Sequence, residues 1–146
     1  VVNGFSFNHD SPLRPNNYIL KKIANYVKRK PKKKLEVGNI NIRRDWGWAP
    51  EYVEAMYLIM QQEEPDDFVV ATGKSHSLKE FLSCVFSYFD LDWEEYVSID
   101  ESLYRPSDIM INRGNPSKVK EVLGWEAKFT LKDIVFAMIE EKHHHQ

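Results

Sequence analysis

Apolar residues recur along the chain with two spacings, one typical of strands and one typical of helices. Apolar and polar residues alternate at the start of the chain up to Phe7, and residues 68–73 form a continuous apolar run closed by a glycine. The alternation predicts a half-buried strand, and the continuous run predicts a strand covered on both faces. Residues 35–38 predict a further short strand after the break at Pro31.

Helical spacing of apolar residues predicts helices between and after these strands. Proline, capping residues and glycine mark their ends. Five helices are predicted, over residues 17–29, from Pro50 onward, after the capping box of Ser77 with Glu80, from Asn115-Pro116 to Gly124, and from Thr130 onward. Residues 91–114 instead predict a long excursion rich in loops.

Strands that alternate with helices indicate an α/β protein, but the predicted strands make only an incomplete sheet. The first strand starts at residue 1 with no methionine ahead of it, so we interpret the chain as the distal part of a longer enzyme. The sequence contains neither a G-x-G-x-x-G turn nor a P-loop. We therefore expect any loop that cradles a dinucleotide to lie upstream of Val1.

The composition is that of a globular protein, with 146 residues, 42% of them hydrophobic, and a net charge of -2. No stretch is long and apolar enough to span a membrane, so we expect no membrane partner. The single cysteine, Cys84, suits a reducing compartment, and a cytoplasmic location is the default.

The basic run at residues 28–34 lacks interleaved aromatic residues, which favours a solvated surface and no nucleic-acid partner. We expect no metal site, because His76 lacks a ligand partner at suitable spacing and residues 143–145 resemble a tag.

Three polar clusters are candidates for chemistry. Asn8 and His9 follow the first strand, at the edge where open α/β sheets bind ligands. The segment Arg43-Arg44-Asp45-Trp46 offers an arginine fork for phosphate, an aspartate to hold it and an indole wall, although a surface ion pair beside a core tryptophan explains it equally. Arg105-Pro106 also has two interpretations. Arg105 contacts a phosphate, or it is a solvated arginine in a turn.

Taken together, these segments resemble the GDP-mannose 4,6-dehydratase family of extended short-chain dehydrogenases. The resemblance runs nearly end to end and is carried by Phe7-Asn8-His9-Asp10-Ser11-Pro12, Gly38-Asn39-Ile40, Arg44-Asp45-Trp46-Gly47, Tyr52-Val53-Glu54-Ala55-Met56, residues 67–73, Arg105-Pro106, Pro116-Ser117-Lys118 and Leu123-Gly124-Trp125. It implies that residues 1–146 form the C-terminal portion, with an incomplete Rossmann-like sheet, a smaller substrate-binding subdomain, and the NADP-binding half missing.

The resemblance also implies a reaction. NADP would take a hydride from C4 of GDP-mannose, water would be lost across C5 and C6, and the hydride would return at C6. The product would be GDP-4-keto-6-deoxymannose, a precursor of GDP-fucose. By similarity, the substrate-binding residues would be Asn8, Lys22, Arg44, Arg105 and Asp108, and the NADP-binding residues would be His9 and Arg14.

The chain departs from the family pattern at several positions. Asp10 replaces a glutamate, Leu13-Arg14-Pro15 replaces Arg-Arg-Gly, and Asp108 is one methylene shorter than the usual glutamate. The family's catalytic threonine, glutamate, tyrosine and lysine have no counterpart, and we regard Tyr18 with Lys22 as a coincidence of spacing. No catalytic residue is therefore assigned.

Three interpretations follow from the resemblance. In the first, the chain is the substrate-binding part of a GDP-mannose dehydratase, inactive alone and homo-oligomeric when complete. In the second, it is a truncated paralogue or interaction module without catalysis. In the third, the complete enzyme is a sibling epimerase or dehydratase for another nucleotide sugar. If upstream strands normally cover the apolar face, we also expect exposed, aggregation-prone surface.

Overall fold

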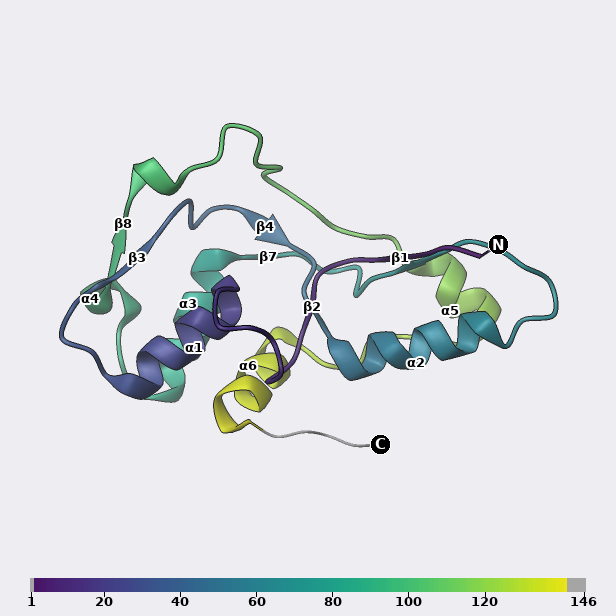
Figure 1. Ribbon diagram of the computed structural model, residues 1–146, viewed down its shortest axis with the longest axis horizontal. Coiled ribbons are helices and arrows are strands. Elements are labelled where there is room, and N and C mark those ends of the chain that lie inside the picture. Colours follow the sequence, from purple (N-terminus) through teal and green to yellow (C-terminus); the bar gives the residue numbers. More distant parts are fainter. Residues whose placement is uncertain (1, 142–146) are drawn as a thin grey trace.

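The computed structural model describes residues 2–141, which form an elongated molecule with two lobes (Figure 1). In chain order the elements are β1 (Gly4–Ser6), β2 (His9–Asp10), α1 (Ile19–Arg29), β3 (Leu35–Val37), β4 (Arg43–Arg44), β5 (Gly47–Trp48), α2 (Ala49–Met60), β6 (Phe68–Val70), β7 (His76–Ser77), α3 (Leu78–Tyr88), α4 (Trp93–Tyr96), β8 (Val97–Ile99), a 3₁₀ turn (Glu101–Leu103), α5 (Ser117–Leu123) and α6 (Leu131–Glu140).

The strands pair two by two rather than in one wide sheet. Three pairs are parallel, β1 with β6, β2 with β5, and β3 with β8, whereas β4 and β7 run antiparallel. Parallel neighbours require a crossover connection, and α2 lies in the connection between β1 and β6. This arrangement confirms the predicted fold class, an α/β chain with an incomplete sheet.

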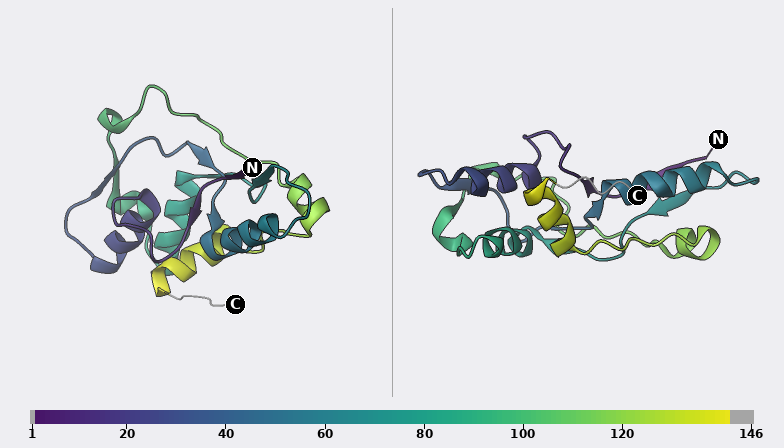
Figure 2. Two further views of the ribbon diagram at one scale, coloured as in Figure 1. Left: turned by 45° about the vertical axis from the view of Figure 1, so that its right-hand side comes forward. Right: turned by 90° about the horizontal axis from the view of Figure 1, so that it is seen from below.

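Apolar side chains form one core in each lobe. The larger core packs α1, α3 and α6 around residues that include Trp46 and Trp48. The smaller core joins α2, β6 and α5 and contains Tyr52 and Trp125. Seen from below in Figure 2, α1 and α2 lie in one layer, and α3 and α5 lie in the other.

Glu51 connects segments that belong to the two cores. Its buried carboxylate accepts hydrogen bonds from the backbone N–H groups of Lys128 and Phe129, at 2.7 and 3.0 Å. Its carbonyl oxygen accepts a hydrogen bond from the indole of Trp125, at 2.9 Å. The first turn of α2 therefore fixes the segment that leads from α5 into α6.

The local signals for helix ends are confirmed. Ser77 and Thr130 cap α3 and α6 with reciprocal capping boxes, and Gly124 ends α5 with a left-handed φ of 68°. The first helix was predicted two residues too early, since Ile19 begins it and residues 16–18 form a turn. The first strand, predicted from residue 1, begins at Gly4 within the described residues.

The prediction of an irregular excursion over residues 91–114 is wrong for its first part. Trp93–Tyr96 forms α4, and Val97–Ile99 forms β8, which pairs with β3 about 60 positions earlier in the chain. A three-residue strand carries little periodicity of its own, so the pairing partner decides its structure. The rest of the excursion contains the 3₁₀ turn and the loop that returns to α5.

The outer face of α2 is apolar and exposed. Val53, Met56, Tyr57 and Met60 occupy one face at helical spacing and are 39–75% exposed. This surface agrees with the expected apolar exposure, while aggregation of the isolated chain stays a prediction. Within residues 2–141, none of the helices has the length and apolar character needed to cross a bilayer.

Candidate functional site

Arg44, on β4, lies directly beside the loop that follows β8. One guanidinium nitrogen is 3.8 Å from a carboxylate oxygen of Asp108, and another donates hydrogen bonds to the carbonyl oxygens of Arg43 and Ile109. The Arg44 side chain is only 16% exposed. Arg44 and Asp108 are therefore in contact, although they lie 64 positions apart in the chain. Both were predicted to belong to one nucleotide site.

Arg105 belongs to the same turn as Asp108. The N–H of Asp108 donates a hydrogen bond to the carbonyl oxygen of Arg105, at 3.1 Å, and the Arg105 side chain is exposed. The ion pair between Arg44 and Asp108 thus holds the Arg105 turn against β4. Arg44 and Asp108 therefore meet at this edge, and the exposed side chain of Arg105 extends from the same turn as Asp108. Guanidinium groups suit phosphate oxygens, and a carboxylate suits a sugar hydroxyl.

Asp45 has a different role from the predicted one. It does not hold an arginine, because its fully buried carboxylate accepts hydrogen bonds from the N–H groups of Thr72, Gly73 and Gly114 and from the Thr72 hydroxyl. The distances are 2.6–3.1 Å. The alternative interpretation, a surface ion pair, is equally wrong for this aspartate. Asp45 fixes the segment that carries Arg44 to the loop after β6.

Asn8 lies between β1 and β2, with its side chain exposed. Its carbonyl oxygen accepts a hydrogen bond from the N–H of Gly47, at 2.8 Å, so its backbone is fixed three residues beyond Arg44 along the β4–β5 segment. The structure therefore holds the backbone of Asn8 against Gly47, on the segment that continues from Arg44.

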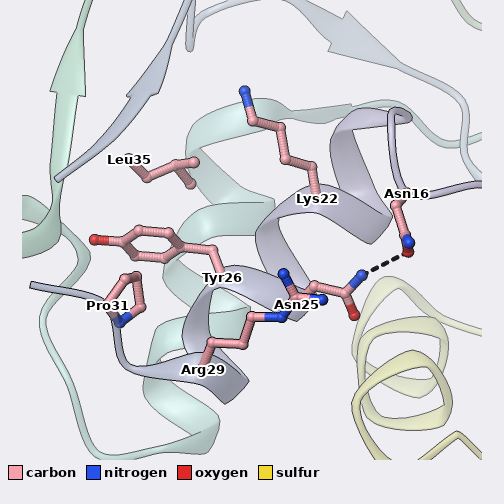
Figure 3. A pocket seen from close by; sticks show the side chains of 7 residues that line it. All are labelled: Asn16, Lys22, Asn25, Tyr26, Arg29, Pro31 and Leu35. Carbon is pink, nitrogen blue, oxygen red and sulfur yellow. Dashed lines mark hydrogen bonds between the residues drawn. The ribbon is translucent and has the colours of Figure 1, made fainter. Parts of the chain in front are cut away.

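Lys22 lies on the exposed side of α1 and lines a cavity of about 320 Å³ (Figure 3). Asn25 and Arg29 line the same cavity, and Asn25 donates a hydrogen bond to the side chain of Asn16, at 2.8 Å. Among residues 2–141, no other residue predicted to bind substrate or cofactor lines this cavity. The structure thus places Lys22 beside a cavity on α1 whose lining includes neither Arg44 nor Arg105.

His9 and Arg14 lie in the segment that follows β1. His9 Nδ1 is 2.7 Å from the carbonyl oxygen of Phe7, so Nδ1 donates a hydrogen bond to that oxygen. The guanidinium of Arg14 pairs with buried Asp10, at 3.1 Å, and covers the ring of Tyr18. Burial raises the pKa of Asp10 despite the opposing effects of Arg14 and His9.

Several polar atoms around this segment are buried without a hydrogen bond within residues 2–141. Ser6 Oγ and the Tyr52 hydroxyl are two of them, and the Tyr52 ring lies 4.8 Å from the His9 ring. Burial raises the pKa of Tyr52, and Asp45 and Glu51 raise it further. Buried polar groups without a hydrogen-bond partner therefore lie in this segment and beside the His9 ring.

We expect Tyr52→Phe to stabilise this chain by about 1–3 kcal/mol, because it removes a buried hydroxyl that has no partner. Urea unfolding followed by tryptophan fluorescence measures the change. Tyr26→Phe is the matched control, since the Tyr26 hydroxyl donates to the carbonyl oxygen of Lys33 at 2.6 Å and its loss should not stabilise. A Tyr52→Phe variant less stable than the parent would contradict the prediction.

Comparison with known proteins decides the family. The model of the GDP-mannose 4,6 dehydratase family matches residues 1–138. The chain belongs to this family. GDP-mannose 4,6 dehydratase 1 of Arabidopsis thaliana is 46% identical over 144 residues, covering 97% of this chain and 40% of the plant protein. The human GDP-mannose 4,6 dehydratase is 35% identical and covers 95% of this chain, which spans 43% of the human protein.

Solved structures show the same fold at low sequence identity. RMD from Pseudomonas aeruginosa, solved with NADPH, has a TM-score of 0.82 at 19% identity, covering 96% of this chain and 47% of its own. UDP-glucose 4-epimerase from Thermotoga maritima, solved with UDP-glucose, has a TM-score of 0.80 at 18% identity, covering 95% of this chain and 44% of its own. The chain thus adopts part of the fold of these larger proteins.

Sequence interpretation missed two residues of this GDP-mannose 4,6-dehydratase family member. Tyr52 was named only within a segment that carries the family resemblance, and the role predicted for Asp45 was to hold an arginine. A signal for Tyr52 was present, since Gly47 precedes the helix and leaves the space that the Tyr52 ring fills. No local signal marks Asp45, because its partners lie 27–69 positions away.

Proposed function

We propose that this chain supplies the nucleotide-sugar binding surface of an enzyme that converts GDP-mannose to GDP-4-keto-6-deoxymannose with NADP. Family membership supports the reaction. The observation that carries the assignment of the surface is the contact between Arg44 and Asp108, which joins β4 to the Arg105 turn. The chain spans less than half of its relatives, and we propose that it is the C-terminal portion and inactive alone.

The two arginines would hold the diphosphate. Arg44 is pre-oriented by two carbonyl oxygens and Asp108, so little side-chain entropy is lost when it binds phosphate. Exposed Arg105 would close from the turn, and Asp108 would accept a hydrogen bond from a ribose hydroxyl. The carboxamide of Asn8 would contact the phosphate or sugar, and Lys22 would add a donor from α1. Firm anchoring keeps one sugar ring in place through successive steps.

NADP would lie against the other side of the β1–β2 segment, held by His9 and by Arg14. When bound, the nicotinamide accepts a hydride from the sugar and later returns it. His9 would contact the cofactor through Nε2, because Nδ1 is occupied by the carbonyl oxygen of Phe7. Arg14 reaches a phosphate only with the nitrogens that its pair with Asp10 leaves available.

Partners and location follow from the same proposal. GDP-mannose is the substrate, the remaining N-terminal part of the enzyme covers β1 and α2, and the complete enzyme is a homo-oligomer. A cytoplasmic location stays a prediction. Each of these statements concerns the whole protein rather than this chain.

Titration calorimetry with GDP tests the proposal. We expect the folded chain to bind GDP and Arg44→Ala to weaken binding about 10–100-fold, since a charged hydrogen bond to phosphate contributes ~1.5–3 kcal/mol. Exposed Lys79 on α3 provides the control, and Lys79→Ala should leave binding unchanged.

A second variant keeps the test decisive if Arg44→Ala unfolds the loop. Arg105→Ala removes an exposed side chain and should weaken GDP binding by a similar factor. UDP and dTDP, titrated alongside, separate a GDP-mannose enzyme from a sibling that uses another nucleotide sugar. A folded chain that ignores GDP would favour the non-catalytic module.

A further inference from the structure

A second polar cavity, of about 370 Å³, lies between the loop after β6, helix α3 and the start of α6. We call it the lysine pocket. Its side chains of interest are Trp46, Lys74, Cys84, Lys128, Phe129 and Lys132. None of its eleven lining residues is acidic, and none belongs to the proposed substrate or cofactor residues.

The three lysines of the pocket have no carboxylate partner within residues 2–141. By contrast, Lys21, Lys28, Lys118 and Lys120 each pair with an acidic side chain. His76 also lines the pocket, and it pairs with Glu80 at 3.4 Å. The acidic side chains bonded to residues of the pocket, Asp45, Glu51, Glu80 and Asp133, already accept hydrogen bonds or form an ion pair there. Lys132 also lies 5.3 Å from the centroid of the Phe136 ring. The three lysines are therefore the cations of the pocket that remain to bind an anion.

The remaining walls are apolar or already satisfied. Phe129 is half-buried and stacks on Trp48, with ring centroids 5.0 Å apart, and Trp46 packs against Phe81 behind it. The hydroxyl of Thr130 is used by the capping box with Asp133, so the helix end contributes little further. The pocket therefore combines a cationic rim with aromatic walls.

We propose that the lysine pocket binds a small phosphomonoester with an apolar, aromatic body. The phosphate would lie among Lys74, Lys128 and Lys132, because a dianion best matches three cations. The body would lie against Trp46 and Phe129. This site can be tested separately from the proposed function, because the pocket contains none of the residues proposed to bind substrate or cofactor.

Cys84 allows the pocket to be tested directly, because it is the chain's single cysteine and lines this cavity. Burial raises the pKa of the Cys84 thiol despite nearby Lys132, so the midpoint of the rise in alkylation rate with pH should lie above that of an ordinary thiol. With the full chain and the neutral reagent N-ethylmaleimide, we expect 1-naphthyl phosphate to protect Cys84, and 1-naphthol to protect it at least about tenfold less well. Equal protection by both compounds, or none by 1-naphthyl phosphate, would overturn the proposal.

Variants that remove the lysine charges provide a second test of the pocket. Lys74→Gln, Lys128→Gln and Lys132→Gln combined should weaken protection about tenfold, because each exposed cation contributes modestly. The matched control is Lys32→Gln, Lys33→Gln and Lys34→Gln combined, which removes the same charge from the exposed basic run and should have no effect. Equal losses in both triple variants would show that net charge alone matters and overturn the site. Circular dichroism checks that both remain folded, and the single lysine variants, each expected to weaken protection, replace any triple that does not.

Discussion

Asp45→Asn should lower the free energy of unfolding by about 1–6 kcal/mol. One carboxylate oxygen of Asp45 accepts from the N–H and hydroxyl of Thr72, and the other accepts from the N–H groups of Gly73 and Gly114. An amide places its NH₂ against one of these pairs, whichever way it is turned. Leaving a buried donor without an acceptor costs ~1–3 kcal/mol, and up to two donors lose theirs.

Urea unfolding of both proteins, at the same pH, measures this change. Thr72→Val is a graded control, because it removes a single hydroxyl and should cost about 1 kcal/mol. Exposed Asp66 pairs with Lys118, and Asp66→Asn controls for the loss of a surface charge. An Asp45→Asn midpoint that matches the Asp66→Asn midpoint would show that the network is not structural.

GDP binding should fall together with stability in Asp45→Asn. Asp45 follows Arg44 directly and holds the strand segment that presents its guanidinium. A variant that remains folded but binds GDP as tightly as the parent would separate the two roles. It would then assign Asp45 to the fold alone.

The sequence predicted those parts of the fold that local chemistry decides. The capping boxes at Ser77 and Thr130 and the glycine after α5 were predicted correctly, because their partners lie within a few residues. Strand β8 was missed, because its pairing with β3 depends on distant contacts. The two separate cores likewise have no signature in periodicity.

The candidate site divides in the same way. The residue types of Arg44 and Arg105 suggested phosphate chemistry, and the family resemblance added Asp108 and grouped the three residues. The structure shows that Arg44 and Asp108 are in contact. The residue type of Asp45 did not reveal that its carboxylate binds backbone N–H groups instead of an arginine. Only the folded chain brings Thr72, Gly73 and Gly114 together around it.

Gly47→Ala should destabilise the chain by about 3 kcal/mol, at the upper end of the usual cost of overpacking. A Cβ at Gly47 would lie 2.3–2.5 Å from two ring carbons and the hydroxyl oxygen of Tyr52, which is fully buried. The ring is confined by His9 on one side, at 4.8 Å, and by Trp125 at 5.7 Å. It therefore cannot turn away without disturbing the smaller core.

Gly4→Ala is the matched control, since a Cβ at Gly4 meets only Ile59, at an ordinary 3.7 Å. We expect its unfolding free energy to be unchanged or raised by less than about 1 kcal/mol. A double-mutant cycle with Tyr52→Leu identifies the cause, because Gly47→Ala should cost less once the ring is removed. An equal cost in both backgrounds would place the strain in the backbone. If the ring is responsible, its displacement also moves His9, so stability and cofactor binding should change together.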